Sequence, residues 1–205
     1  MIGPDLLAAP VTADRAEADG QAGDSTPVSV YLPAGQWIDL YSGQVVQGGQ
    51  TITRSASLDE IPLYMKAGTA IGFGLRSPDI WASGWNVDDL SQPGRSSYLI
   101  APAQGQARAL SSEQGSLTAV TAGASTEIHL RRAPSEAQVL VLESQTPAGI
   151  TVNGRVLPRY DSTDGLRAAP EGWMMTSAPF GGVLLKLQLT DGNALLKIRY
   201  EVPPG

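Results

Sequence analysis

Two adjacent carboxylates lie close in sequence to two tryptophans. Asp88 and Asp89 follow Trp81 and Trp85 in a segment rich in Pro and Gly. Such a group can form a sugar-binding surface, because Trp rings stack on sugar faces, or a cation-binding surface. The alternative is a solvated loop whose tryptophans pack into a domain interface, and this alternative is favoured because neighbouring side chains usually point apart. The four residues are therefore candidates for carbohydrate contact and not for a catalytic pair.

Trp173 is a further candidate for carbohydrate contact, and two methionines follow it. Met174 and Met175 can line an apolar pocket, but Met is also a common gap-filler of protein cores. We expect the two methionines to lie in a core.

A single histidine stands in an alternating segment. His129 lies between Ile128 and Leu130, so in a strand it shares the polar face with Glu127 and Arg131. A lone His without a Ser or carboxylate partner in a recognisable motif does not define a catalytic triad or a metal site. We expect a structural role for His129.

Composition excludes several classes of function. The chain has 205 residues, no Cys and a net charge of −6, with no dense Lys/Arg cluster. Disulfides, thiolate chemistry and nucleic-acid binding are therefore not expected. No apolar run reaches the ~20 residues needed to cross a membrane, and Gly72-Phe73-Gly74 lacks the lysine of a phosphate-binding loop. We expect no cofactor and no metal, and the compartment stays open.

The pattern around these residues is β throughout. Val28, Val30 and Leu32 alternate with polar or exposed positions, and Leu185 and Leu187 share one strand face. Asn153-Gly154 is typical of a type I′ hairpin turn. High Gly and Pro content, 23 and 15 residues, indicates many short elements joined by turns. The sequence predicts an all-β protein with two antiparallel β-sandwich domains in tandem.

The domain boundaries follow from a break in this pattern. We expect a proximal sandwich over residues 1–75, an interdomain crossing over residues 76–96 and a distal sandwich over residues 97–205. The crossing mixes Pro, Gly, Trp and Asp without periodicity, whereas strands resume after it at spacings of roughly eight to twelve residues.

Three ordered motifs identify a family resemblance. They are G-P-D-L-L-A-A-P-V at residues 3–11, V-Y-L-P-A-G-Q-W at residues 30–37 with Asp39 just beyond, and L-D-E-I-P-L-Y-M-K-A-G at residues 58–68. The series resembles the β-domain that follows the catalytic barrel in glycoside hydrolase family 31, the α-glucosidase and α-xylosidase family. Residues 3–11 then correspond to the segment leading out of that barrel, and a distal β-sandwich often follows.

The resemblance implies a retaining glycosidase as the parent enzyme, with two catalytic aspartates in the barrel. The family nucleophile lies in W-x-D-M-[NS]-E, a motif that this chain lacks. Trp37-Ile38-Asp39 matches the W-x-D that begins this motif, but the chain then continues as Leu40-Tyr41 and does not complete it. The remaining motif residues end strands, fill a small core or cap turns. We therefore expect no catalytic residues here.

The sequence favours a non-catalytic C-terminal accessory region that stabilises the barrel of a family-31-like enzyme. The alternatives are a carbohydrate-binding β-sandwich and an oligomerisation domain. The expected partner is the parent's (β/α)8 barrel, with carbohydrate as an alternative ligand, and neither nucleic acid nor membrane is expected. Because a domain built to cover a barrel exposes an apolar patch when alone, we also expect self-association.

Overall fold

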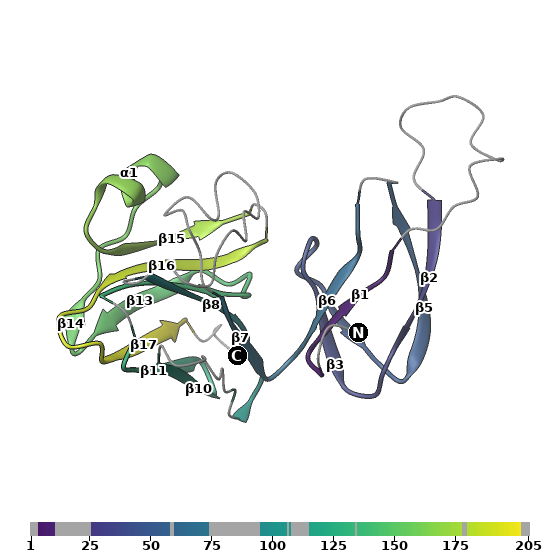
Figure 1. Cartoon of the computed structure of the whole chain (residues 1–205), viewed down its shortest axis with the longest axis horizontal. Helices are drawn as coiled ribbons and strands as arrows, with labels where there is room; N and C mark the ends of the chain where they lie inside the picture. The colour runs from purple at the N-terminus through teal and green to yellow at the C-terminus, as the bar shows by residue number, and fades with distance from the viewer. Residues whose placement is uncertain are drawn as a thin grey trace. The chain divides into compact units, whose positions relative to one another are not determined.

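The computed structural model describes residues 4–10, 26–57, 60–73, 95–105, 107, 115–133, 135–177 and 180–201. The chain divides into two compact units, Met1–Ala67 and Gly68–Gly205 (Figure 1).

The first unit contains two antiparallel sheets. One has the strand order β1-β6-β3-β4, and the other pairs β2 with β5. The strands are β1 (Leu6–Ala8), β2 (Thr26–Leu32), β3 (Gln36–Asp39), β4 (Val45–Gln47), β5 (Gln50–Ala56) and β6 (Leu63–Lys66). Leu6 pairs with Met65, so the sheet joins the start of the unit to its end.

A small core lies between these sheets. It consists of Leu7, Val30, Leu32, Trp37 and Tyr64, which come from strands of both sheets. The alternation predicted for β2 is confirmed, since Val30 and Leu32 are buried and the intervening Tyr31 is exposed. The indole of Trp37 is also paired, because its Nε1 donates to the carbonyl oxygen of Pro33 at 2.8 Å.

The second unit contains two five-stranded sheets, which Figure 1 shows as two layers. Their strand orders are β10-β11-β17-β13-β14 and β15-β16-β12-β8-β7. The strands of the first sheet are β10 (Ser116–Ala122), β11 (Ser125–Arg131), β13 (Pro147–Val152), β14 (Arg155–Val156) and β17 (Ala194–Tyr200). Those of the second are β7 (Thr69–Phe73), β8 (Arg95–Ala101), β12 (Glu136–Val141), β15 (Gly172–Thr176) and β16 (Gly182–Gln188).

The inward faces of the two sheets form one core. Ile128 and Leu130 contribute from β11, and Leu185 and Leu187 contribute from β16. Every side chain from 137 to 141 is buried, so β12 is covered on both faces. This arrangement is a packed β-sandwich, and the all-β prediction is confirmed.

One strand pair differs from the antiparallel expectation. β12 pairs with β8 in parallel, with Val139 opposite Tyr98. Parallel neighbours need a crossover connection, and here the chain between them forms the β10–β11 hairpin in the opposite sheet. The crossover is therefore a hairpin and not a helix.

Two local features complete the unit. The predicted turn at Asn153-Gly154 is confirmed, because both residues have positive φ, 49° and 81°, and Val152 pairs with Arg155 across it. A short helix, α1 (Thr163–Ala168), was not expected from the sequence. Ser162 caps it by accepting a hydrogen bond from the Gly165 amide at 3.1 Å.

Candidate functional site

A partly buried ionic cluster lies in the first unit, where Asp39 is buried and Arg54 and Glu60 are half-buried. Arg54 Nε is 2.9 Å from Asp39 Oδ2, and Arg54 Nη2 is 2.5 Å from Glu60 Oε1. Asp39 ends β3 and Arg54 belongs to β5, so the ion pair connects the two sheets. Glu60 directly precedes Ile61-Pro62-Leu63 in the third family motif. Its ion pair with Arg54 therefore holds this part of the motif against β5.

The second oxygen of Asp39 caps a turn. Oδ1 accepts hydrogen bonds from the amides of Tyr41 at 2.9 Å and Ser42 at 3.1 Å. The predicted turn-capping role of Asp39 is thereby confirmed. Because both carboxylate oxygens are engaged in these contacts, Asp39 is held as a structural anion and is not positioned as a nucleophile.

Two tyrosines, Tyr41 and Tyr64, lie next to the cluster, and its charges influence the pKa of each. The Arg54 guanidinium lies over the Tyr41 ring at 5.4 Å from the centroid. Burial raises the pKa of Tyr64, and the negative charge of Asp39 raises it further. For Arg54, burial lowers the pKa, but the hydrogen bond that Arg54 donates to Glu60 and the charge of Asp39 outweigh burial and raise it overall. The guanidinium therefore stays charged inside the unit.

Two polar atoms of this cluster are buried and have no hydrogen-bond partner among the described residues, namely Arg54 Nη1 and the Tyr64 hydroxyl. Tyr64 has no exposed surface. Such atoms raise the free energy of the folded state, because they lose water without gaining another partner.

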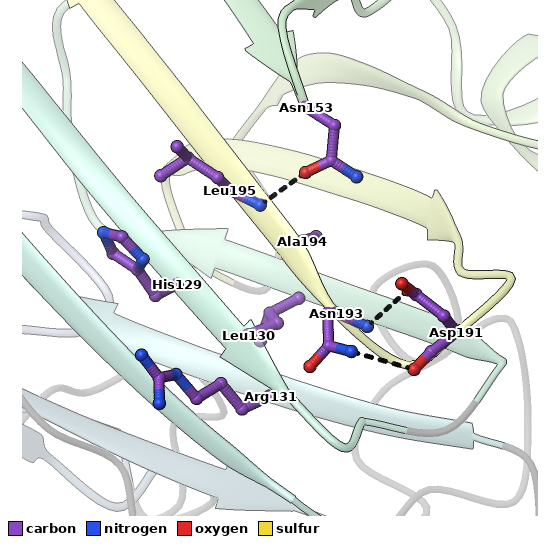
Figure 2. Close-up of a pocket in the computed structure, with 8 residues that line it drawn as sticks. All are labelled: His129, Leu130, Arg131, Asn153, Asp191, Asn193, Ala194 and Leu195. Atoms are coloured by element: carbon purple, nitrogen blue, oxygen red, sulfur yellow. Dashed lines mark hydrogen bonds between the residues drawn. The ribbon is translucent and has the colours of Figure 1, made fainter.

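A polar groove of about 380 Å³ lies on the second unit (Figure 2). His129 and Arg131 project from β11, and the neighbouring strand β17 contributes Leu195, the register partner of His129. Asn153 comes from the hairpin turn, and Asn193 from the connection that precedes β17. The groove therefore lies over the solvent face of the sheet, and Leu130 and Ala194 complete its lining.

Hydrogen bonds fix the groove's side chains from the turns. Asn153 Oδ1 accepts from the Leu195 amide at 2.9 Å. Asp191 Oδ1 accepts from the Asn193 amide at 2.9 Å, and the Asn193 side-chain nitrogen donates to the Asp191 carbonyl at 3.1 Å. Figure 2 shows these three bonds at one side of the groove and the side chains of His129 and Arg131 at the other.

The predicted polar face of His129 is confirmed, since Glu127, His129 and Arg131 alternate with buried residues on β11. Among the described residues, no cluster of three or more His, Cys, Asp or Glu side chains can hold a metal ion. In the same residues, no helix is long and apolar enough to cross a membrane.

The structure describes one of the five residues expected to contact carbohydrate. Trp81, Trp85, Asp88 and Asp89 lie outside the described residues. Trp173 is 4% exposed, its Nε1 donates to the Leu157 carbonyl at 3.2 Å, and Arg159 lies over its ring at 5.4 Å. A sugar ring can stack on Trp173 only after the Arg159 side chain moves off the indole ring.

Sequence reasoning did not find the Arg54 cluster or the groove. A signal for Arg54 was present, because it shares a strand face with Ile52 and Ala56 and so points toward the core. An Arg on a buried face needs an anionic partner. The groove had no such signal, since its residues come from three separate segments.

A comparison with known families shows to which family the first unit belongs. Residues 1–71 match the family described as the glycosyl hydrolase family 31 C-terminal domain. Residues 1–71 belong to the C-terminal domain of glycoside hydrolase family 31. The resemblance predicted from the three ordered motifs is thereby confirmed.

Relatives of this family 31 region cover different parts of it. An isomaltosyltransferase from Sporosarcina globispora is 27% identical over 215 residues, which cover 100% of this chain and 19% of the relative. Alpha-glucosidase 2 from Bacillus thermoamyloliquefaciens is 32% identical over 74 residues, covering 36% of this chain and 8% of the relative. The chain thus spans about a fifth or less of these relatives.

A solved structure shares the fold of nearly the whole chain. A cycloalternan-forming enzyme from Listeria monocytogenes, solved with a pentasaccharide substrate, superposes with a TM-score of 0.79 at 23% identity. The match covers 97% of this family 31 region and 18% of the enzyme. The succession of these two β units is therefore also found inside a larger enzyme.

Proposed function

We propose that this family 31 region is a non-catalytic accessory part of a larger enzyme and that its first unit stabilises the catalytic (β/α)8 barrel. One observation carries the proposal. Of the six exposed large apolar side chains among the described residues, four belong to the first unit: Tyr31, Tyr41, Val45 and Ile61. That unit has a small core and would lower its free energy by covering these side chains.

The ionic cluster supports the same role. Ile61 is 50% exposed and directly follows Glu60, which Arg54 holds at 2.5 Å. An apolar side chain next to a fixed anchor loses little entropy on docking, which favours a permanent interface. The proposed occupant is the barrel of the same enzyme, because Ile61 belongs to a motif of the family β-domain.

The activity of the whole enzyme is part of the proposal. Two curated relatives that match almost the whole chain are named isomaltosyltransferase and 1,6-alpha-glucosyltransferase. We propose that the parent of this region transfers or hydrolyses α-linked glucose units, with both catalytic aspartates in the barrel. The region itself should then show no turnover of aryl α-glucosides or α-xylosides, and turnover by the purified chain would contradict its accessory role.

A matched pair of variants tests the barrel contact. We expect Ile61→Ser to lower the melting temperature of the full-length parent and to leave that of the isolated chain unchanged or slightly raised. Val156→Ser is the control, because Val156 is 72% exposed in the second unit and should be neutral in both proteins. Equal effects of Ile61→Ser in parent and isolated chain would show that Ile61 contacts no barrel.

A further inference from the structure

We propose that the groove of the second unit binds a neutral saccharide of about one or two sugar rings. This site goes beyond the barrel-supporting role and is independent of it. The groove volume of about 380 Å³ is at the lower end of the range for small-molecule sites. The polar part of its lining consists of His129, Arg131, Asn153, Asp191 and Asn193. Together these planar side chains offer both hydrogen-bond donors and hydrogen-bond acceptors.

The lining suits hydroxyl groups better than phosphate or carboxylate. Arg131 and Asp191 carry opposite charges within the groove, so neither sign dominates. On β11 and β17 next to it, Lys197 Nζ is 2.8 Å from Glu127 Oε1, and this charge is paired as well. A neutral ligand with many hydroxyls can use such donors and acceptors together, whereas an anion would meet Asp191.

The groove is also preorganised, because hydrogen bonds within the protein already hold several of its polar side chains in place. Asn153 Oδ1 is engaged by the Leu195 amide, which leaves the Asn153 NH2 group to donate. Asp191 and Asn193 hold each other through two hydrogen bonds. Within the described part of the chain, the side chains of His129 and Arg131 make no hydrogen bond or ion pair. Polar side chains that are already fixed lose little conformational entropy when a ligand binds, and those without a hydrogen bond can form one to the ligand.

Leu195 supplies the apolar contact that a sugar face requires. It is the register partner of His129 and lies partly exposed in the groove (Figure 2). Among the described residues that line the groove there is no Trp, Tyr or Phe, so strong stacking on a sugar face is not expected and the affinity should be in the millimolar range.

The test is a titration of the 205-residue chain with isomaltotriose, followed by NMR of backbone and side-chain amides. We expect shifts at Asn153, Asn193 and Leu195 that saturate with a Kd near 1 mM. Inorganic phosphate should cause no such shifts. Absence of shifts up to about 20 mM sugar, shifts confined to other residues, or stronger binding of phosphate would each overturn the proposal.

Two variants connect binding to the groove. Arg131→Gln should weaken isomaltotriose about tenfold by removing charged donors. Asn153→Gly keeps the left-handed turn and removes the amide, so it should weaken binding also. Arg199→Gln is the control, because Arg199 is exposed on β17 away from the groove. Circular dichroism verifies that each variant folds, and unchanged affinity in a folded Arg131→Gln would contradict the site.

Discussion

Arg54 Nε lies 2.9 Å from Asp39 Oδ2 and joins the two sheets of the first unit through a partly buried ion pair. The side chain of Asp39 is 7% exposed and that of Arg54 is 16% exposed, so little of either contacts solvent. Since Asp39 also caps the turn after β3, one carboxylate serves both sheet packing and local backbone geometry.

Arg54→Met should destabilise the first unit by about 3 kcal/mol, because it leaves Asp39 charged, buried and unpaired. Amide hydrogen exchange of β3 and β5 would measure this loss locally. The double variant Arg54→Met with Asp39→Asn should recover part of the loss, since it removes the isolated charge. If exchange in these strands stays unchanged in Arg54→Met, the ion pair contributes no stability.

Tyr64→Phe should raise the unfolding free energy at pH 7 by about 1 kcal/mol, because the Tyr64 hydroxyl is buried and has no partner in the part of the chain that the structure describes. Tyr31→Phe is the control, since Tyr31 is 61% exposed. Chemical denaturation monitored by circular dichroism would compare the two variants. A clear loss of stability in Tyr64→Phe would mean that its hydroxyl is hydrogen-bonded after all.

Alkaline pH should destabilise the chain through the same tyrosine. Burial and the charge of Asp39 raise the pKa of Tyr64 in the folded state, above about 10 for an unfolded tyrosine. Its contribution is fully present below about pH 10 and is lost as pH rises through the folded pKa, because the unfolded state ionises first. Denaturation at pH 8 to 11 should show a smaller alkaline loss in Tyr64→Phe than in the unmodified chain.

Gly48→Ala should be much more harmful than Gly49→Ala. A Cβ on Gly48 would collide with the Pro33 carbonyl oxygen, which also accepts the Trp37 indole hydrogen. Gly49 has φ of 81°, and a Cβ there would meet only Ala34 Cα at 3.9 Å, an ordinary van der Waals contact, so Ala should cost about 1 kcal/mol of backbone strain. Melting temperatures of the two variants would test the order, and equal values would contradict the close approach.

Asn153→Ala should cost more stability than Asn153→Gly. Both variants lose the hydrogen bond to the Leu195 amide, but Ala must also adopt φ of 49°. The difference should be about 1 kcal/mol, measurable by denaturant unfolding of the second unit. An Ala variant as stable as the Gly variant would show that this turn relaxes to another conformation.

The sequence predicts those features that depend on neighbouring residues. Alternation at Val30 and Leu32, the Asn153-Gly154 turn and the capping by Asp39 each follow from short segments, and the structure confirms them. The parallel pairing of β8 with β12 was missed, because it joins strands separated by a hairpin of the other sheet. The groove was missed for a similar reason, since residues 129–131, 153 and 191–195 meet only in the folded sheet.

The position of β17 affects how the second unit can form during synthesis. This strand follows all other described strands in the chain, yet it lies in the middle of its sheet between β11 and β13. Until Ala194–Tyr200 leaves the ribosome, β11 and β13 have no common neighbour, and the strand edges that pair with β17 stay without hydrogen-bond partners in the sheet. Folding of this unit should therefore be completed only after β17 has been synthesised, with an earlier period in which the unpaired strand edges make the chain prone to aggregate.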